Sequence, residues 1–377
     1  MYLQSNKFKN VSGELAGSLG DLGTFLPYVI GAIAIAGLDV TGVLVMCGLM
    51  YLFTAWVYRL PIPVQPMKVI GAAIIVNHFT AGEVAAAGLI VGSIMLVIGL
   101  TGAIEKLACI TPLSVTLGIQ AGLGISLAIL GMEMVSSDWL IGVPVMLVML
   151  LLLNNRRLPA SIVAIVGGTA LSFILHPELN LPSLDIGLSL PHLIWPAAAD
   201  FNRGFLQGAL PQFPLTLANS VLVTTYLASQ LFPGQSDRVT NRNLCLTLGV
   251  GNLVGAPLGM IPICHGSGGL AAHYRFGART HYATAFIGVL LLLIGLLFGT
   301  SGLQLLQLIP SAVLGAMLFY SGLELVKAID TRDSLEMFVY AGVVVLSIAL
   351  NPAIGFLSGL IVYWFSKKVK DVISPPV

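Results

Sequence analysis

The sequence predicts an all-α polytopic membrane protein with fourteen transmembrane segments, arranged as two inverted repeats of seven. Composition is the first observation that points there. Of 377 residues, 57% are hydrophobic and only 9% are charged, and the mean hydropathy is +0.96. Soluble domains carry about 25% charged residues, so this chain has too little charge to cover a globule of its size in water. A net charge of +1 without a basic block also excludes nucleic-acid binding as the main role.

Apolar runs separated by short polar breaks give the positions of the spans. A membrane-crossing helix needs about 20 residues, and fourteen spans leave about 27 residues for each helix with its loop. The predicted spans are 13–36, 40–58, 62–78, 82–101, 107–131, 138–153, 158–176, 204–232, 241–259, 261–275, 280–299, 303–328, 334–350 and 352–367. The first repeat is then 1–176 and the second is 204–377, with a Pro-rich extracytoplasmic connection over 177–203.

The distribution of basic residues is the second observation, because cytoplasmic loops are enriched in Lys and Arg. With a cytoplasmic N-terminus and alternating spans, only Arg203 falls outside and Lys68 falls within a span. The other basic residues all fall on the inner side: Lys7, Lys9, Arg59, Lys106, Arg156, Arg157, Arg238, Arg242, Arg275, Arg279, Lys327, Arg332, Lys367, Lys368 and Lys370. If one span had been missed, every later loop would be assigned to the opposite side of the membrane, and this asymmetry would be lost. Both termini are therefore predicted to be cytoplasmic, and in a bacterium the membrane would be the inner (plasma) membrane.

No pattern indicates an enzyme, a metal site or a cofactor. The four cysteines lie in apolar segments without CxxC spacing, which is typical of small buried hydrophobic residues. The sequence contains no HExxH, no GxSxG with supporting partners and no ATP-binding GxxxxGK[ST] loop. No cleavable signal peptide is evident at the N-terminus.

Two internal alignments, the third observation, indicate the inverted repeat. Residues 62–68 (IPVQPMK) parallel residues 261–267 (IPICHGS) at an offset of 199. Residues 17–21 (GSLGD) parallel residues 208–212 (GALPQ) at an offset of 191. Seven spans in each half place the halves in opposite orientation, which is a common carrier architecture. Span 1 is thus paired with span 8, and span 3 with span 10.

Spans 3 and 10 are unusual because each has only about 15 residues, too few to cross a core of roughly 30 Å as a helix. Each opens with prolines, which remove backbone donors and disfavour helix. We expect an extended first half, then a half-helix that begins near the bilayer middle at Met67 and at Gly266. Such backbone must be buried in protein or line a cavity. Two facing half-helix N-termini would bind an anion through free amides and positive dipole ends.

Polar residues near these two ends form the candidate substrate site. A charge as deep as that of Lys68 is costly and usually functional, although a purely structural pairing with Asp21 is the alternative. The glycines around Ser267 would let a ligand reach the backbone amides. The full set of candidates is Lys68, Gln65, Met67, Asp21, Thr24, Gln212, Asn219, His265, Gly266, Ser267 and Gly268. Asp21 and His265 are also candidates for proton coupling, and a packing role for His265 is an equal alternative.

Three motifs carry a resemblance to a known family. They are 20–25 (GDLGTF), 63–68 (PVQPMK), and 264–270 (CHGSGGL) followed by 274–280 (YRFGART). They resemble the molybdate-transporter family, which is related to the SulP sulfate permeases, and the resemblance spans most of the chain. It implies the fourteen-span fold of SulP and nucleobase permeases. In that fold a core domain of spans 1–4 and 8–11 moves against a gate domain of spans 5–7 and 12–14, with substrate near spans 1, 3, 8 and 10.

The resemblance implies a secondary active transporter of a tetrahedral oxyanion by alternating access, with molybdate first and sulfate or tungstate as alternatives. A nucleobase-type permease is disfavoured, because such relatives use carboxylates in spans 8 and 10, and residues 208–232 and 261–275 contain no Asp or Glu. An anion channel is a further alternative. The expected partners are the oxyanion and the lipid bilayer, and a homodimer is left open. Because the chain ends about ten residues after the last span, we do not expect the STAS domain of the SulP relatives.

Overall fold

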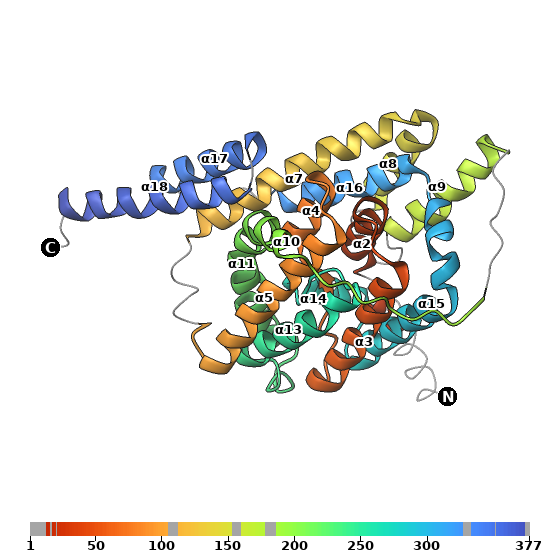
Figure 1. The fold of residues 1–377 in the computed structure, drawn as a ribbon, viewed down its shortest axis with the longest axis horizontal. Coiled ribbons are helices and arrows are strands. Elements are labelled where there is room, and N and C mark those ends of the chain that lie inside the picture. Colours follow the sequence, from red (N-terminus) through yellow and green to blue (C-terminus); the bar gives the residue numbers. More distant parts are fainter. Residues whose placement is uncertain are drawn as a thin grey trace.

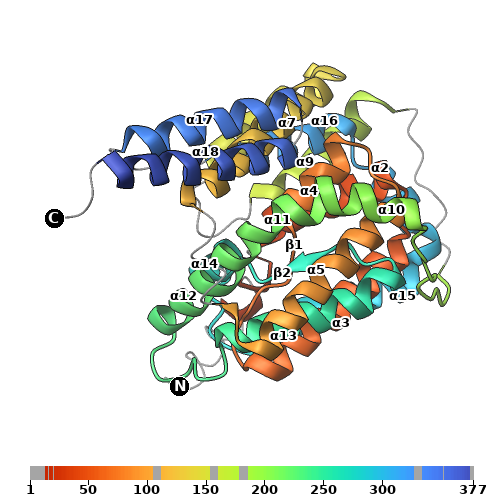
Figure 2. The same cartoon turned by 60° about the vertical axis from the view of Figure 1, so that its left-hand side comes forward.

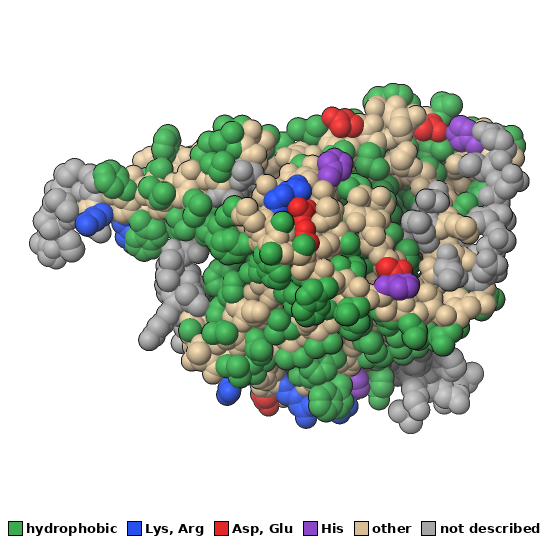
Figure 3. Space-filling model, in the orientation of Figure 1, with side chains coloured by type: hydrophobic (Ala, Val, Ile, Leu, Met, Phe, Trp, Pro, Cys, Tyr) green, Lys and Arg blue, Asp and Glu red, His purple; other side chains and the backbone are tan. Residues whose placement is uncertain are grey.

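The structure is a computed structural model that describes residues 13–15, 17–19, 21–104, 112–152, 160–177, 186–326, 333–350 and 352–373. It is mostly helical, and its helices pack side by side in one block from which α17 and α18 project at one end (Figures 1 and 2). Hydrophobic side chains cover much of the face in Figure 3, and charged side chains on it are few. Such a surface fits the predicted membrane environment.

The helices of the first half follow the predicted spans closely. Among the described residues, four helices are long and apolar enough to cross a membrane, namely α3, α5, α7 and the first part of α15. The first-half helices are α2 (Leu22–Ala36), α3 (Val40–Tyr58), α4 (Lys68–Val76), α5 (Ala81–Thr101), α7 (Leu113–Ser136), α8 (Trp139–Leu152) and α9 (Ala160–Leu175).

The second half begins with one long helical run that contains two π-helical segments. Its parts are α10 (Ala198–Arg203), η1 (Gly204–Ala209), α11 (Leu210–Leu215), η2 (Thr216–Val223) and α12 (Thr224–Leu231). The remaining helices are α13 (Asn241–Gly255), the 3-10 turn η3 (Ala256–Leu258), α14 (Ser267–Phe276), α15 (His281–Gln307), α16 (Ser311–Leu325), α17 (Ser334–Ala349) and α18 (Pro352–Ile373).

Several predicted boundaries differ from the observed helix ends, and two of these differences concern the connections between spans. The connection predicted over 177–203 ends in α10, which continues without a break into the helix that follows. The span predicted to begin at residue 303 begins at Ser311, because α15 runs through to Gln307. Pro310 precedes Ser311 and has no backbone N–H for a helical hydrogen bond, so it separates the two helices. The glycines near residue 300 did not end α15.

Local sequence explains where several helices begin. The side chain of Asp39 accepts hydrogen bonds from the amides of Thr41 (3.3 Å) and Gly42 (3.0 Å) and so caps α3. Thr80 and Glu83 form a capping box at the start of α5. These side chains satisfy amides that the first turn of a helix leaves without partners.

Glycines at four-residue spacing on α5 and α7 allow these helices to approach their neighbours closely. A methyl group added to Gly92 would lie 2.9 Å from the amide nitrogen of Leu253 on α13. A methyl group added to Gly118 would lie 2.8 Å from Cβ of Val343 on α17. Larger residues at these positions would push the paired helices apart.

Spans 3 and 10 have the predicted broken form. Strand β1 (Gln65–Pro66) pairs antiparallel with strand β2 (Ile263–Cys264), and Gln65 lies opposite Cys264. Helix α4 begins directly after Met67, and α14 begins directly after Gly266. Both strands are buried in protein, as non-helical backbone at membrane depth requires. The two strands therefore bring the beginnings of α4 and α14 to one place in the fold.

Candidate anion-binding site

Two buried histidines hold the extended segment that leads to α4. Nδ1 of His273 lies 3.0 Å from the carbonyl oxygen of Pro61, and Nδ1 of His265 lies 2.8 Å from that of Pro63. A carbonyl only accepts, so each ring donates through Nδ1. The prolines in this segment have no backbone N–H, so the segment has few hydrogen-bond donors. The histidine side chains satisfy the carbonyl oxygens of Pro61 and Pro63.

His265 has no ring nitrogen left for a ligand. Its Nε2 lies 3.0 Å from the hydroxyl of Thr247, and Tyr58 packs edge-on against its ring. Its own carbonyl accepts a 2.7 Å hydrogen bond from Thr224. These contacts fit the packing role of His265 that was the alternative in the sequence.

Gln212 caps the beginning of α4. Its Oε1 accepts hydrogen bonds from the amides of Val69 (2.9 Å) and Ile70 (3.3 Å), and its Nε2 donates to Thr216 at 2.9 Å. The side chain is fully buried. Among the described residues, the side chain of Gln212 is thus bonded within the protein, and α4 has two of its first-turn amides already paired.

Asp21 and Gln65 form a buried pair beside the beginning of α14. Nε2 of Gln65 donates to Oδ1 of Asp21 at 2.6 Å. A methyl group added to Gly269 would lie 2.6 Å from Oδ2 of Asp21, and one added to Gly266 would lie within contact distance of Gln65. Glycine is therefore needed at both positions so that these side chains can pack against the first turn of α14.

Lys68 is half-buried at the first position of α4. Within the described parts of the chain it makes no ion pair with Asp21 or any other carboxylate.

The beginning of α14 is the open end of the site. Gly268 is exposed, and a methyl group added to it would meet no atom within 4 Å. Among the described residues, no acceptor pairs with the backbone amides of Ser267 and Gly268. The Ser267 hydroxyl donates at 2.5 Å to Oδ1 of Asn219, which lies in the π-helical segment η2. Two free amides, a hydroxyl and a side-chain amide thus surround one helix N-terminus, which favours negative charge.

The two remaining candidates contribute less. The Met67 side chain is fully buried in the core, and its backbone amide donates to the carbonyl of Pro262 at 2.8 Å. The side chain of Thr24 lies outside the described part of the structure. The sequence reasoning missed Thr224, Thr247 and His273, whose roles depend on contacts between distant segments and leave no motif.

Comparison with known proteins assigns the family. The model described as "Molybdate transporter of MFS superfamily" matches residues 13–127 and 204–325. The chain belongs to the molybdate transporter family. It is 32% identical to Molybdate transporter 2 of Arabidopsis thaliana over 96% of this chain and 89% of that protein. It is 29% identical to Molybdate transporter 1 of Chlamydomonas reinhardtii over 92% of this chain and 90% of that protein.

Solved structures of other transporters share the fold of this chain, although their sequence identity to it is low. The transmembrane domain of the cyanobacterial bicarbonate transporter BicA matches with a TM-score of 0.69 and 19% identity, covering 94% of this chain and 98% of that one. Murine Slc26a9, an anion transporter in the inward-facing state, matches with a TM-score of 0.70 and 16% identity, covering 95% of this chain and 68% of that one. The chain is an integral membrane protein with a transporter fold, and it is not an enzyme.

Proposed function

We propose that this protein is a secondary active transporter of molybdate that binds the anion at the N-terminus of α14. The observation that carries this proposal is that, within the part of the chain that the structure describes, no acceptor pairs with the amides of Ser267 and Gly268 at the open beginning of α14. Lys68 supplies a positive charge from α4, and Asn219 supplies a neutral donor. Sulfate and tungstate have the same shape and charge, and the choice of molybdate rests on the names of the relatives.

The two helix ends play unequal parts in this proposal. Gln212 already accepts from two amides of α4, so α4 contributes its dipole and Lys68, whereas α14 contributes free N–H groups. Hydrogen bonds to a charged group are each worth about 1.5–3 kcal/mol. Three or four such contacts can hold a desolvated dianion. The anion can reach these groups because Gly268 is exposed and no atom lies close to it.

Two features support the inverted repeat of seven plus seven spans. The sequence offset of 199 between spans 3 and 10 equals the difference between the paired residues Gln65 and Cys264, so equivalent residues meet at the strand pair. The offset of 191 makes Asp21 equivalent to Gln212. Gln212 accepts from the amide of Ile70, and Asp21 lies against Gly269, which is the equivalent of Ile70. A two-fold relation between the halves explains both coincidences.

The broader architecture follows the same proposal. The core domain comprises spans 1–4 and 8–11, and the gate domain comprises spans 5–7 and 12–14, in a total of fourteen. Alternating access then moves the core, with its anion, against the gate. Both termini lie in the cytoplasm, and in a bacterium the membrane is the inner one. A homodimer is compatible with this arrangement.

We propose Asp21 as the proton-coupling residue. Its carboxylate is buried beside the first turn of α14, where an ionised form repels an incoming anion. Protonation removes that repulsion, so anion and proton would be carried together. His265 is dropped from this role, because both of its ring nitrogens are bound within the protein.

Purified protein in proteoliposomes tests the proposal. We expect saturable uptake of labelled molybdate that is accelerated by unlabelled molybdate on the opposite side, because alternating access requires such counter-flow. Excess sulfate and tungstate should compete, and uracil should not. Uptake without counter-flow would indicate a channel, and competition by uracil alone would indicate a nucleobase permease. The Asp21→Asn variant should keep counter-flow but lose its acceleration by an inward proton gradient.

A further inference from the structure

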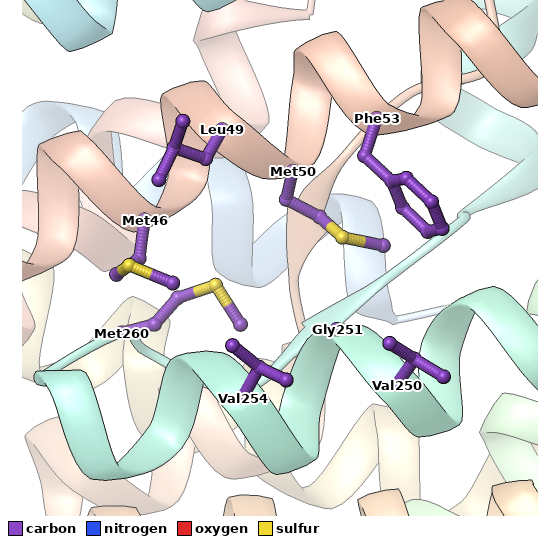
Figure 4. A pocket seen from close by; sticks show the side chains of 8 residues that line it. All are labelled: Met46, Leu49, Met50, Phe53, Val250, Gly251, Val254 and Met260. Carbon is purple, nitrogen blue, oxygen red and sulfur yellow. The ribbon is translucent and has the colours of Figure 1, made fainter.

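An apolar groove separates α3 from α13 on the outer surface of the helical block. Its cavity volume is about 180 Å³. Figure 4 shows the side chains that line it. Met46, Met50 and Phe53 come from α3, Val250 and Val254 from α13, and Met260 from the segment that leads to β2. Leu49 and Val254, on the rim, are 44% and 55% exposed, so the groove opens toward the membrane.

The glycines of α13 shape this groove. A methyl group added to Gly251 would lie 2.6 Å from the methionine methyl of Met50, and one added to Gly255 would lie 2.3 Å from that of Met260. The nearest atoms to Gly251 and Gly255 are thus methionine side-chain atoms and not the backbone of a neighbouring helix. The two glycines make room for flexible methionine side chains, which can adapt to an apolar occupant.

One end of the groove carries positive charge. The Tyr58 hydroxyl donates to the carbonyl of Asn243 at 3.0 Å, which joins the end of α3 to the beginning of α13. Arg59 and Arg242 are the chain neighbours of these two residues, and both are exposed. Arg238 is also exposed and donates to the carbonyl of Val57 at 3.4 Å. Three arginines thus gather where the two helices meet, and the adjacent Asp237 offsets only one of them.

We propose that the groove binds one acyl chain of an anionic phospholipid whose headgroup lies on Arg59 and Arg242. Met50 and Arg59 are nine residues apart on α3, which is about 13 Å at 1.5 Å per residue. Half of a hydrocarbon core of about 30 Å is about 15 Å, so a chain that hangs from a headgroup at the arginines reaches the groove. Anionic headgroups gain free energy from each nearby arginine, and a zwitterionic lipid does not gain it to the same extent.

Native mass spectrometry of the detergent-purified protein tests this site, with phosphatidylglycerol and phosphatidylcholine as probes. We expect the wild type to retain phosphatidylglycerol preferentially. Val254→Phe fills the groove and should abolish most of this retention. Leu293→Phe is the matched control, because Leu293 is 48% exposed, against 55% for Val254, and lies on α15 outside the groove. Arg59→Gln and Arg242→Gln should each reduce the preference about fivefold. Equal retention by both phenylalanine variants, or no effect of either arginine, would overturn the proposal.

Quenching of the fluorescence of Trp56 by brominated lipid gives a second test of the site. It is 65% exposed on α3 and stacks against Phe53, which lines the groove. In a variant whose other tryptophans are phenylalanine, brominated-chain phosphatidylglycerol should quench Trp56 more strongly than the matching phosphatidylcholine. Val254→Phe should remove that difference. Equal quenching by the two lipids in the parent protein would contradict specific binding.

Discussion

Replacing Lys68 by Gln should weaken molybdate binding without weakening the fold. The lysine is half-buried and has no ion pair among the described residues, so its loss leaves no carboxylate unpaired. Two unit charges about 4 Å apart attract by about 4 kcal/mol at an effective dielectric constant of 20. Desolvation of the lysine and the anion offsets part of this attraction, and a charge-assisted hydrogen bond contributes about 1.5–3 kcal/mol in net terms. The dissociation constant should therefore rise about 10- to 150-fold.

Isothermal titration of molybdate into purified protein measures this change, with the thermal midpoint recorded alongside. Lys368→Gln is the matched control, because Lys368 is exposed on α18 far along the chain from the broken spans. We expect the control to bind as the wild type does. A change of less than about threefold for Lys68→Gln, with an unchanged midpoint, would refute a direct contact between Lys68 and the anion.

Three other substitutions probe the same account. The Gly268→Val variant should fold normally, because the added side chain meets open space. It should weaken molybdate binding more than tenfold, on the order of 1.4 kcal/mol or more, because the valine covers the amides of α14. An unchanged dissociation constant in the titration would place the anion elsewhere. Gln212→Leu should lower the free energy of unfolding by about 1–3 kcal/mol, because the amides of Val69 and Ile70 lose their acceptor; an unchanged chemical-denaturation midpoint would contradict that role. In the turn between α7 and α8, which lies outside both helices, the hydrogen bond with His176 lowers the pKa of Asp138 from its ordinary value of 3.8. A depressed pKa adds stability above the unfolded-state value that is lost as pH falls through the folded-state value, so Asp138→Asn should lower the thermal midpoint slightly at pH 5 and by less at pH 3. An equal effect at both pH values would show that the charge of Asp138 is irrelevant.

The broken spans could be predicted because their signals are local. Prolines at positions 61, 63 and 66 exclude a regular helix, and the apolar run after Met67 is too short to cross the membrane. The structure confirms both half-helix starts at the predicted residues. The predicted substrate-site residues include Ser267, Gly268 and Lys68, which lie in the first turns of the two half-helices.

The roles of individual polar residues could not be predicted, because they depend on contacts between segments far apart in sequence. Gln212 meets Val69 across 143 positions, and His265 meets Pro63 across 202. A polar side chain in an apolar span must satisfy its hydrogen bonds, but the sequence does not say whether protein or ligand does so. The π-helical segments were missed for a related reason. Pro211 and Pro214 indicate irregular helix, but not which bonding pattern replaces it.

The structure of the protein bound to tungstate, a strongly scattering analogue of molybdate, tests the central claim most directly. We predict that the anion lies at the beginning of α14, with oxygens about 2.7–3.2 Å from the amide nitrogens of Ser267 and Gly268 and with Lys68 turned toward it. A bound tungstate that contacts neither amide, in protein whose uptake of molybdate is intact, would contradict the account.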